Sequence, residues 1–366
     1  MLTYLAELSH IFGPLRVFDA LTFRAISAAL TAFLVTLWLA PHAIRMLTRL
    51  KLGQPIRGKE EVHKLAELHG SKKGTPTMGG IIILLTLSLS CLLWAKPTNL
   101  YLWVVLVPTL MLGALGFLDD YLKIKKKKSE GITSRQKLFG QILIAAAVGI
   151  FLISHPDTKD AARSLELPFI KVAVLENLSW LAVGFFILVI SGSSNAVNLT
   201  DGLDGLAAGC TVSVAVVFGL FAYVTDNKEF AAYLLLPRNP GVAELSVFCA
   251  ALTGASLGFL WFNCHPAKVF MGDTGSLAIG GAIAVVAICV NQEFLLVLVG
   301  GVFVMEALSV ILQVASFKLT GKRIFAMSPI HHHFELKGWN ESTVVVRFWI
   351  LSLVFALLGL ATLKLR

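Results

Sequence analysis

Aspartates stand at the borders of long apolar runs throughout this sequence, and five of them lie in notably polar surroundings: Asp119, Asp120, Asp201, Asp204 and Asp273. Carboxylates gathered at one place repel one another, which raises their pKa values unless a cation lies among them. Oxygen ligands of this kind favour Mg²⁺, which keeps several waters and takes one or two carboxylates together with substrate phosphates. The sequence therefore predicts magnesium-assisted phosphate chemistry, provided that the fold brings these aspartates together.

Asp119 and Asp120 are adjacent, in the segment LDDYLK at 118–123. Neighbouring residues on a helix point about 100° apart, so we expect two separate tasks rather than an equivalent pair on one ion. Lys123 falls within one helical turn of both and is the expected charge partner. A solvated helix end is the alternative interpretation of this pair.

A second polar segment, NAVNLTDGLDGLAAG at 195–209, repeats Asn or Asp every three residues: Asn195, Asn198, Asp201 and Asp204. This spacing predicts one stripe along a helical turn that leads into the next apolar run. Gly202 and Gly205 carry no side chains, so a ligand or another helix can approach closely there. Helix capping explains one of these aspartates but not the whole stripe.

Asp273 lies in FMGDTGS at 270–276, directly before an apolar run. Taken alone it predicts a helix N-cap, a common position for Asp. Asn263, His265 and Lys268 crowd the preceding residues, which favours a binding site over a simple cap.

His331, His332 and His333 are consecutive. Three consecutive side chains on a helix splay apart, and no Cys or spaced His completes a tetrahedral zinc set. Separate contacts with phosphate or sugar hydroxyls fit better, with an interfacial loop as the alternative. Near 70–75 the order of residues excludes a P-loop, but Lys72 and Thr77 could still cradle a phosphate.

The elements that must position these residues are membrane-spanning helices. The chain has 366 residues, 56% of them hydrophobic and 14% charged, with a mean hydropathy of +0.78. A spanning helix needs about 20 apolar residues, and ten runs qualify: 22–44, 78–95, 101–118, 137–154, 178–192, 203–224, 242–262, 276–291, 294–316 and 344–363. We expect one all-α, polytopic transmembrane domain over 1–366, with a short interfacial segment at about 1–21.

Basic residues orient this domain. Of the 31 lysines and arginines, 20 fall on one set of alternate connections and nine on the other. The positive-inside rule places the richer set in the cytoplasm and both termini in the periplasm. The polar segments described above all fall on the cytoplasmic side. Most of the net charge of +9 then follows from topology, and the basic cytoplasmic face attracts anionic lipids and substrates. No nucleic-acid surface is expected.

Five motifs in this order resemble the phospho-N-acetylmuramoyl-pentapeptide transferase family, which belongs to the polyprenyl-phosphate N-acetylhexosamine-1-phosphate transferase superfamily. They are TPTMGG at 75–80, LDDYLK at 118–123, NAVNLTDGLDGLAAG at 195–209, FMGDTGS at 270–276 and PIHHHFE at 329–335. The resemblance extends over essentially the whole chain. It implies ten spans in the bacterial inner membrane, and the family's tendency to dimerise favours a homodimer.

The resemblance implies transfer of phospho-MurNAc-pentapeptide from UDP-MurNAc-pentapeptide to undecaprenyl phosphate, with Mg²⁺, giving lipid I and UMP in peptidoglycan synthesis. Asp273 matches the metal ligand, and Asp119, Asp120, Asp273 and His332 match catalytic positions. The matching substrate positions are Lys72, Thr77, Asn195, Asn198, Asp201, Gly202, Leu203, Asp204, Asn263, Phe270, His331 and His333. We expect Asp119 to act as the base and Phe270 to stack on uracil. Direct attack by the lipid phosphate and a phospho-aspartate intermediate on Asp119 or Asp273 both stay open.

Three other functions remain to be weighed. A transferase that moves GlcNAc-1-phosphate onto the same lipid would share the acidic motifs, although TPTMGG and PIHHHFE favour the muramoyl-pentapeptide branch. A cation transporter would need polar residues across the midplane of the membrane, where Glu306 is the main candidate. An intramembrane aspartyl protease would need two aspartates within hydrocarbon depth, whereas the motifs here lie at its border.

Overall fold

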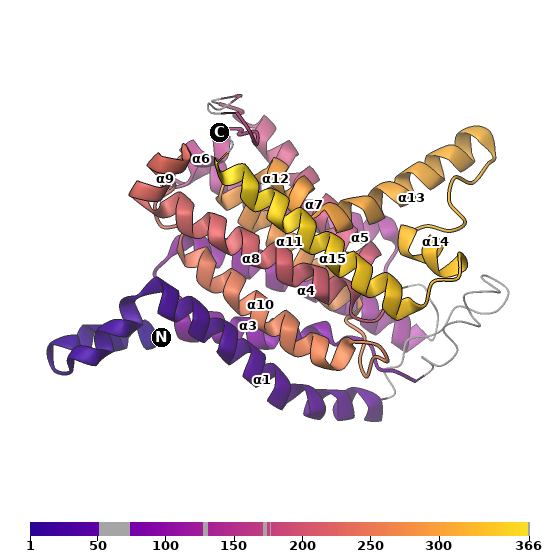
Figure 1. Ribbon diagram of the computed structural model, residues 1–366, viewed down its shortest axis with the longest axis horizontal. Helices are drawn as coiled ribbons and strands as arrows, with labels where there is room; N and C mark the ends of the chain where they lie inside the picture. Colours follow the sequence, from indigo (N-terminus) through magenta and orange to yellow (C-terminus); the bar gives the residue numbers. More distant parts are fainter. Residues whose placement is uncertain (51–73, 127–130, 171–173, 176, 365–366) are drawn as a thin grey trace.

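The computed structural model describes residues 1–50, 74–126, 131–170, 174–175 and 177–364, and these residues form a bundle of helices (Figure 1). Within this part of the chain no strand is present, and Leu165 and Leu175 form an isolated bridge. The α-helices are α1 Leu21–Arg49, α3 Gly80–Trp94, α4 Leu100–Lys126, α5 Ser134–Ser154, α6 Lys159–Arg163, α7 Leu181–Thr200, α8 Leu206–Asp226, α9 Lys228–Leu234, α10 Glu244–Asn263, α11 Gly272–Cys289, α12 Glu293–Val299, α13 Gly301–Thr320, α14 Ile330–Leu336 and α15 Glu341–Ala361. The predicted all-helical, polytopic membrane fold is confirmed.

Nine of the ten predicted apolar runs each overlap a single α-helix, and the run at 294–316 overlaps two. In the described ranges nine helices are long and apolar enough to cross a membrane, and α3, with 15 residues, is shorter. The count of ten spans and the side on which the termini lie stay predictions. Before α1, the short 3-10 helices η1 (Leu2–His10) and η2 (Gly13–Asp19) project from the bundle (Figure 1).

One predicted span is wrong in detail. The run at 294–316 is broken at Gly300, so that the seven-residue α12 is followed by a separate α13. Glycine is a poor helix former, and Gly300 and Gly301 are adjacent at this break. Beyond it, α13 leans away from the bundle (Figure 1), and much of its apolar surface, including Ile311 and Phe317, is exposed for contact with lipid.

Helix α11 forms the centre of the bundle (Figure 1), and 89% of its most apolar window is buried. It packs chiefly against α4 and α7. Small residues permit this packing, because helices approach closely where side chains are short. A Cβ at Gly80 of α3 would collide with the backbone of Gly275. The first turn of α11 is therefore held tightly between its neighbours, and Asp273 lies in that turn.

Candidate active site

The carboxylates of Asp119, Asp120 and Asp273 come together where α4 ends and α11 begins. One oxygen from each lies within 4.8 Å of the others. Both α4 aspartates lie on the helix, which continues to Lys126, rather than in a connection as the apolar run had suggested. The two carboxylates have different partners, since Asp119 contacts Lys123 and the Ile132 nitrogen whereas Asp120 contacts the start of α11.

Asp120 binds the N-terminus of α11. Its carboxylate accepts hydrogen bonds from the backbone nitrogens of Asp273 and Thr274, at 3.3 and 3.0 Å, and from the Thr274 hydroxyl at 2.9 Å. Asp273 itself lies within the first helical turn, after the N-cap Met271. The alternative interpretation of Asp273 as an N-cap does not hold, because Asp120 accepts the hydrogen bonds of these helix donors from another helix.

Two lysines and one asparagine surround the Asp273 carboxylate. Lys123 and Lys137 place their Nζ atoms 3.0 and 2.7 Å from Oδ2, and Asn198 donates to Oδ1 at 2.8 Å. Lys123 also contacts Asp119 at 2.6 Å, as its spacing predicts. Lys137 was not among the predicted site residues, and its place at the start of an apolar helix was the one available signal.

The stripe predicted for 195–204 is divided by the end of α7. Asn195 and Asn198 lie on the helix, Asp201 caps it, and Asp204 lies in the turn before α8. Asn198 donates to the Asp273 carboxylate, whereas the Asn195 amide donates to Gln141 and to the Ser191 carbonyl. The prediction that these four residues form one stripe along a helical turn is therefore wrong.

The Asp201 carboxyl faces the backbone of Gly272, at the start of α11. Burial raises the pKa of the Asp201 carboxyl, and the negative charges of Asp273 and Asp120 raise it further. The α7–α8 turn is thus electrostatically linked to the carboxylate centre.

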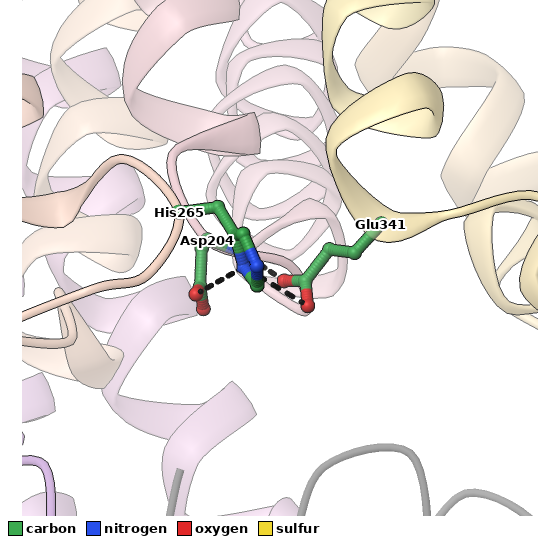
Figure 2. Close-up of side chains that lie close together, drawn as sticks. All are labelled: Asp204, His265 and Glu341. Carbon is green, nitrogen blue, oxygen red and sulfur yellow. Dashed lines mark hydrogen bonds and ion pairs between the residues drawn. The ribbon is translucent and has the colours of Figure 1, made fainter. Parts of the chain in front are cut away.

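Asp204 belongs to a second cluster, with His265 and Glu341 (Figure 2). His265 Nδ1 lies 3.1 Å from Asp204 Oδ2 and 3.5 Å from Glu341 Oε2. Backbone donors occupy the same carboxylates: Ala267 donates to Asp204 at 3.0 Å, and the Asp204 nitrogen donates to Glu341 at 2.9 Å. These contacts join the turn before α8, the loop after α10 and the first turn of α15.

Several of the predicted substrate residues are buried in this region and contact its loops. Asn263 is buried; it donates to the Val269 carbonyl at 2.8 Å and accepts from the Gly205 nitrogen at 3.1 Å. Leu203 and Thr77 are buried as well. Phe270 is half-buried, and its backbone pairs with Pro76 and Gly79.

Gly202, in contrast, is exposed in the α7–α8 turn. The predicted phosphate ligand Lys72 lies outside the described residues.

The three histidines lie on the short helix α14 and have different partners, as consecutive positions predict. His331 Nδ1 is 3.1 Å from Glu306 Oε2, and His332 Nδ1 is 2.8 Å from Glu335 Oε2. His333 Nδ1 accepts from the Ala326 nitrogen at 3.0 Å. Each of the three imidazoles therefore has its own hydrogen-bond partner.

Comparison with known proteins first identifies the class of protein that this chain resembles. The family model described as glycosyl transferase family 4 matches residues 102–291, which contain most of the helices around α11 and all five of the motif aspartates. Phospho-N-acetylmuramoyl-pentapeptide-transferase signature 1 matches residues 72–84. The chain is also 57% identical to the phospho-N-acetylmuramoyl-pentapeptide-transferase of Methylacidiphilum infernorum (isolate V4), over 366 residues and the whole of both chains. This chain belongs to the phospho-N-acetylmuramoyl-pentapeptide-transferase family.

Proposed function

We propose that the chain transfers phospho-MurNAc-pentapeptide from UDP-MurNAc-pentapeptide to undecaprenyl phosphate, forming lipid I and UMP for peptidoglycan synthesis. The observation that carries this proposal is the 57% identity, over both full lengths, to a protein of that printed name. The proposed location is the bacterial inner membrane, with the aspartate centre on the cytoplasmic face. A lipid phosphate then arrives along the membrane and the nucleotide arrives from the water.

The chemistry of the carboxylates fits Mg²⁺, which we propose as the cofactor. Three oxygens within 4.8 Å of one another, from Asp119, Asp120 and Asp273, are the hard ligands that this ion prefers. Asp273 is the proposed principal ligand, since Asp120 is already engaged by α11. When bound, the ion neutralises charge on the diphosphate and polarises it.

The protein's own residues supply positioning and charge, which are the main requirements of phosphoryl transfer. Lys123 and Lys137, now paired with Asp273, are placed to bind the oxygens of the diphosphate. Asp120 holds the α11 N-terminus and thereby the Asp273 carboxylate. Asp119, which accepts from the Ile132 nitrogen at 2.8 Å, is the proposed base for the lipid phosphate.

In the direct route, an oxygen of the lipid phosphate attacks the phosphorus that carries the sugar, and the bond to the UMP phosphate breaks. Three side chains engage both oxygens of Asp273, namely Asn198, Lys123 and Lys137. These contacts favour a stabilised carboxylate over a nucleophile, and we therefore propose the direct route. A trapped phospho-aspartate at Asp119 or Asp273 would contradict it.

The test is UMP release by the purified, full-length protein with undecaprenyl phosphate. We expect release from UDP-MurNAc-pentapeptide and none from UDP-GlcNAc, loss of activity with EDTA, and recovery with added Mg²⁺. Release from UDP-GlcNAc alone would assign the sister reaction instead, and activity that survives complete chelation would exclude the metal. The expected homodimer stays a prediction, which light scattering of the purified protein would test.

A further inference from the structure

A fully buried glutamine, Gln141, lies in the apolar helix α5, one helical turn beyond Lys137 of the carboxylate centre. A polar side chain inside a membrane protein is costly unless its hydrogen bonds are made, and such residues mark functional sites by default. Gln141 was not among the predicted site residues, because it belongs to the apolar run at 137–154. Its contacts nevertheless connect it with the carboxylate centre.

Both polar atoms of the Gln141 amide contact α7. Nε2 donates to the Ser194 hydroxyl at 3.0 Å, and Oε1 accepts from the Asn195 amide at 2.9 Å. The Ser194 hydroxyl in turn donates to the Leu277 carbonyl of α11 at 3.0 Å. Gln141 therefore joins α5 directly to α7, and through one hydroxyl to α11.

These contacts form a polar layer one helical turn deeper in the bundle than the carboxylate centre. The deeper layer consists of Gln141, Ser194, Asn195 and Leu277, and the centre includes Lys137, Asn198 and Asp273. On each of the three helices the two layers are three or four residues apart, which is a rise of about 5–6 Å. The deeper layer can therefore fix the register in which the three helices meet at the centre.

The register of α5 decides where the Lys137 amine lies. Its Nζ is 2.7 Å from Asp273 Oδ2 and donates to the Asn198 amide oxygen at 3.4 Å. Because the lysine stem is long and flexible, the amine keeps this place only if the helix that carries it is fixed. Gln141 is the polar contact that α5 makes with α7 one turn away.

The packing of α7 against α11 leaves little freedom at this level. A Cβ at Gly280 would lie 2.7 Å from the Cα of Ser194, and the Ser193 hydroxyl donates to the Gly280 carbonyl at 2.8 Å. These two helices are thus in backbone contact, and the Gln141 amide attaches α5 to the pair.

We propose that Gln141 is a positioning residue, which sets the register of α5 so that the Lys137 amine meets Asp273 and the phosphate oxygens of the nucleotide-activated substrate. Asn195, a predicted substrate position, acts through Gln141 and not by contact with the substrate. The proposal rests on the proposed function.

The test compares Gln141→Leu, which removes the amide, with Tyr101→Phe. We expect Gln141→Leu to lower the kcat for UMP release about tenfold to a hundredfold, since misplacing a catalytic group by about 1 Å has effects of this size. The matched control Tyr101→Phe removes a buried hydrogen bond to Asn239 at the other end of α4. It should lower the thermal midpoint by a comparable amount and change kcat less than about twofold.

A double-mutant cycle with Lys137 separates positioning from general damage. In a Lys137→Met background, Gln141→Leu should lower kcat no further, because the amine that it places is gone. General damage would lower kcat by the same factor in both backgrounds.

A second cycle tests the role of Asn195. Asn195→Ala should lower kcat in the otherwise wild-type protein and have no further effect beside Gln141→Leu. A residue that touches the substrate would instead raise the KM for UDP-MurNAc-pentapeptide in both backgrounds.

An unchanged kcat in the folded Gln141→Leu variant would overturn the proposal, as would an equal loss in the Lys137→Met background. A nucleotide KM that Asn195→Ala raises equally with and without Gln141→Leu would also contradict it. If Gln141→Leu does not fold, Gln141→Asn, whose amide is one methylene too short to reach both partners, takes its place with the same expected results. A wild-type protein that releases no UMP would instead refute the proposed function, so the two failures are distinguishable.

Discussion

Asp120 and Asp273 show how two aspartates in one cluster take different tasks. Asp120 is 4% exposed and accepts three hydrogen bonds from the first turn of α11. Asp273 is half-buried and contacts two lysines. Residue type and spacing predicted that both belong to the site. They did not predict which one is structural, because that depends on donors from a helix that begins more than 150 residues further along the chain.

We expect Asp273→Asn to lower UMP release at least about a hundredfold, the scale at which loss of one electrostatic contact in a catalytic site is measured. The amide loses the charge that is proposed to hold Mg²⁺ and that pairs with Lys123 and Lys137. The thermal midpoint should change little, because Asp120 and not Asp273 anchors the helix. Activity assays and thermal unfolding of the purified variant check both parts; wild-type activity would contradict the site assignment.

Unlike Asp273→Asn, the substitution Asp120→Ala should lower the stability of the protein. It leaves the Asp273 and Thr274 nitrogens without their acceptor, at a cost of about 1–3 kcal/mol for an unsatisfied buried group. We therefore expect lower thermal stability together with lower activity. Thr274→Ala, which removes only one of the donors, is the milder comparison. Unchanged stability in Asp120→Ala would show that α11 is held without it.

At the scale of elements, the order of helices was predictable and their ends were not. Long apolar runs identify spans reliably, because lipid tolerates few charges. The polar final turns of α4 and α7 were assigned to connections since they lack that apolar signal, yet Asp119 and Asn198 lie on them. Glu341 was missed altogether, because nothing near it in sequence indicates that α15 meets the α7–α8 turn.

Close approach of α4 to α11 gives a test at this scale. A Cβ on Gly116 would collide with the Asp273 backbone and lie 2.7 Å from the Thr274 nitrogen. Gly116→Ala should therefore displace the first turn of α11 and lower activity about tenfold or more, with destabilisation of roughly 1–3 kcal/mol from overpacking. Activity and thermal unfolding are the measurements.

Gly184→Ala is the matched control, because nothing lies within 4 Å of a Cβ at that helical position. Alanine favours a helix over glycine, so this variant should be as stable as the wild type and as active. Equal effects of the two substitutions would contradict the proposed packing.

For the whole molecule, Cys264 offers a native probe of orientation. It is exposed, whereas Cys91, Cys210, Cys249 and Cys289 are buried. Since the loop after α10 is predicted to be cytoplasmic, a membrane-impermeant maleimide should label Cys264 in inverted vesicles and not in intact spheroplasts. Labelling is scored by a gel shift, with Cys264→Ser as the blank.

A cysteine placed at Lys228, exposed on α9, should behave in the opposite way in the Cys264→Ser background. Labelling of Cys264 in intact spheroplasts would contradict the topology predicted from the basic residues and indicate the opposite orientation.

The hydrogen bonds that join the α7–α8 turn to α15 have a consequence for the protein's synthesis. Besides Glu341, Trp349 of α15 donates from Nε1 to the Gly205 carbonyl at 3.2 Å. The turn lies near the middle of the chain, whereas Glu341 and Trp349 both belong to α15, the last α-helix. A nascent chain that has already inserted α4, α7 and α11 therefore still lacks two supports of the turn that is predicted to contact the substrate. We expect competence for the nucleotide to arise only when translation is nearly complete, so that a half-made protein would not capture substrate.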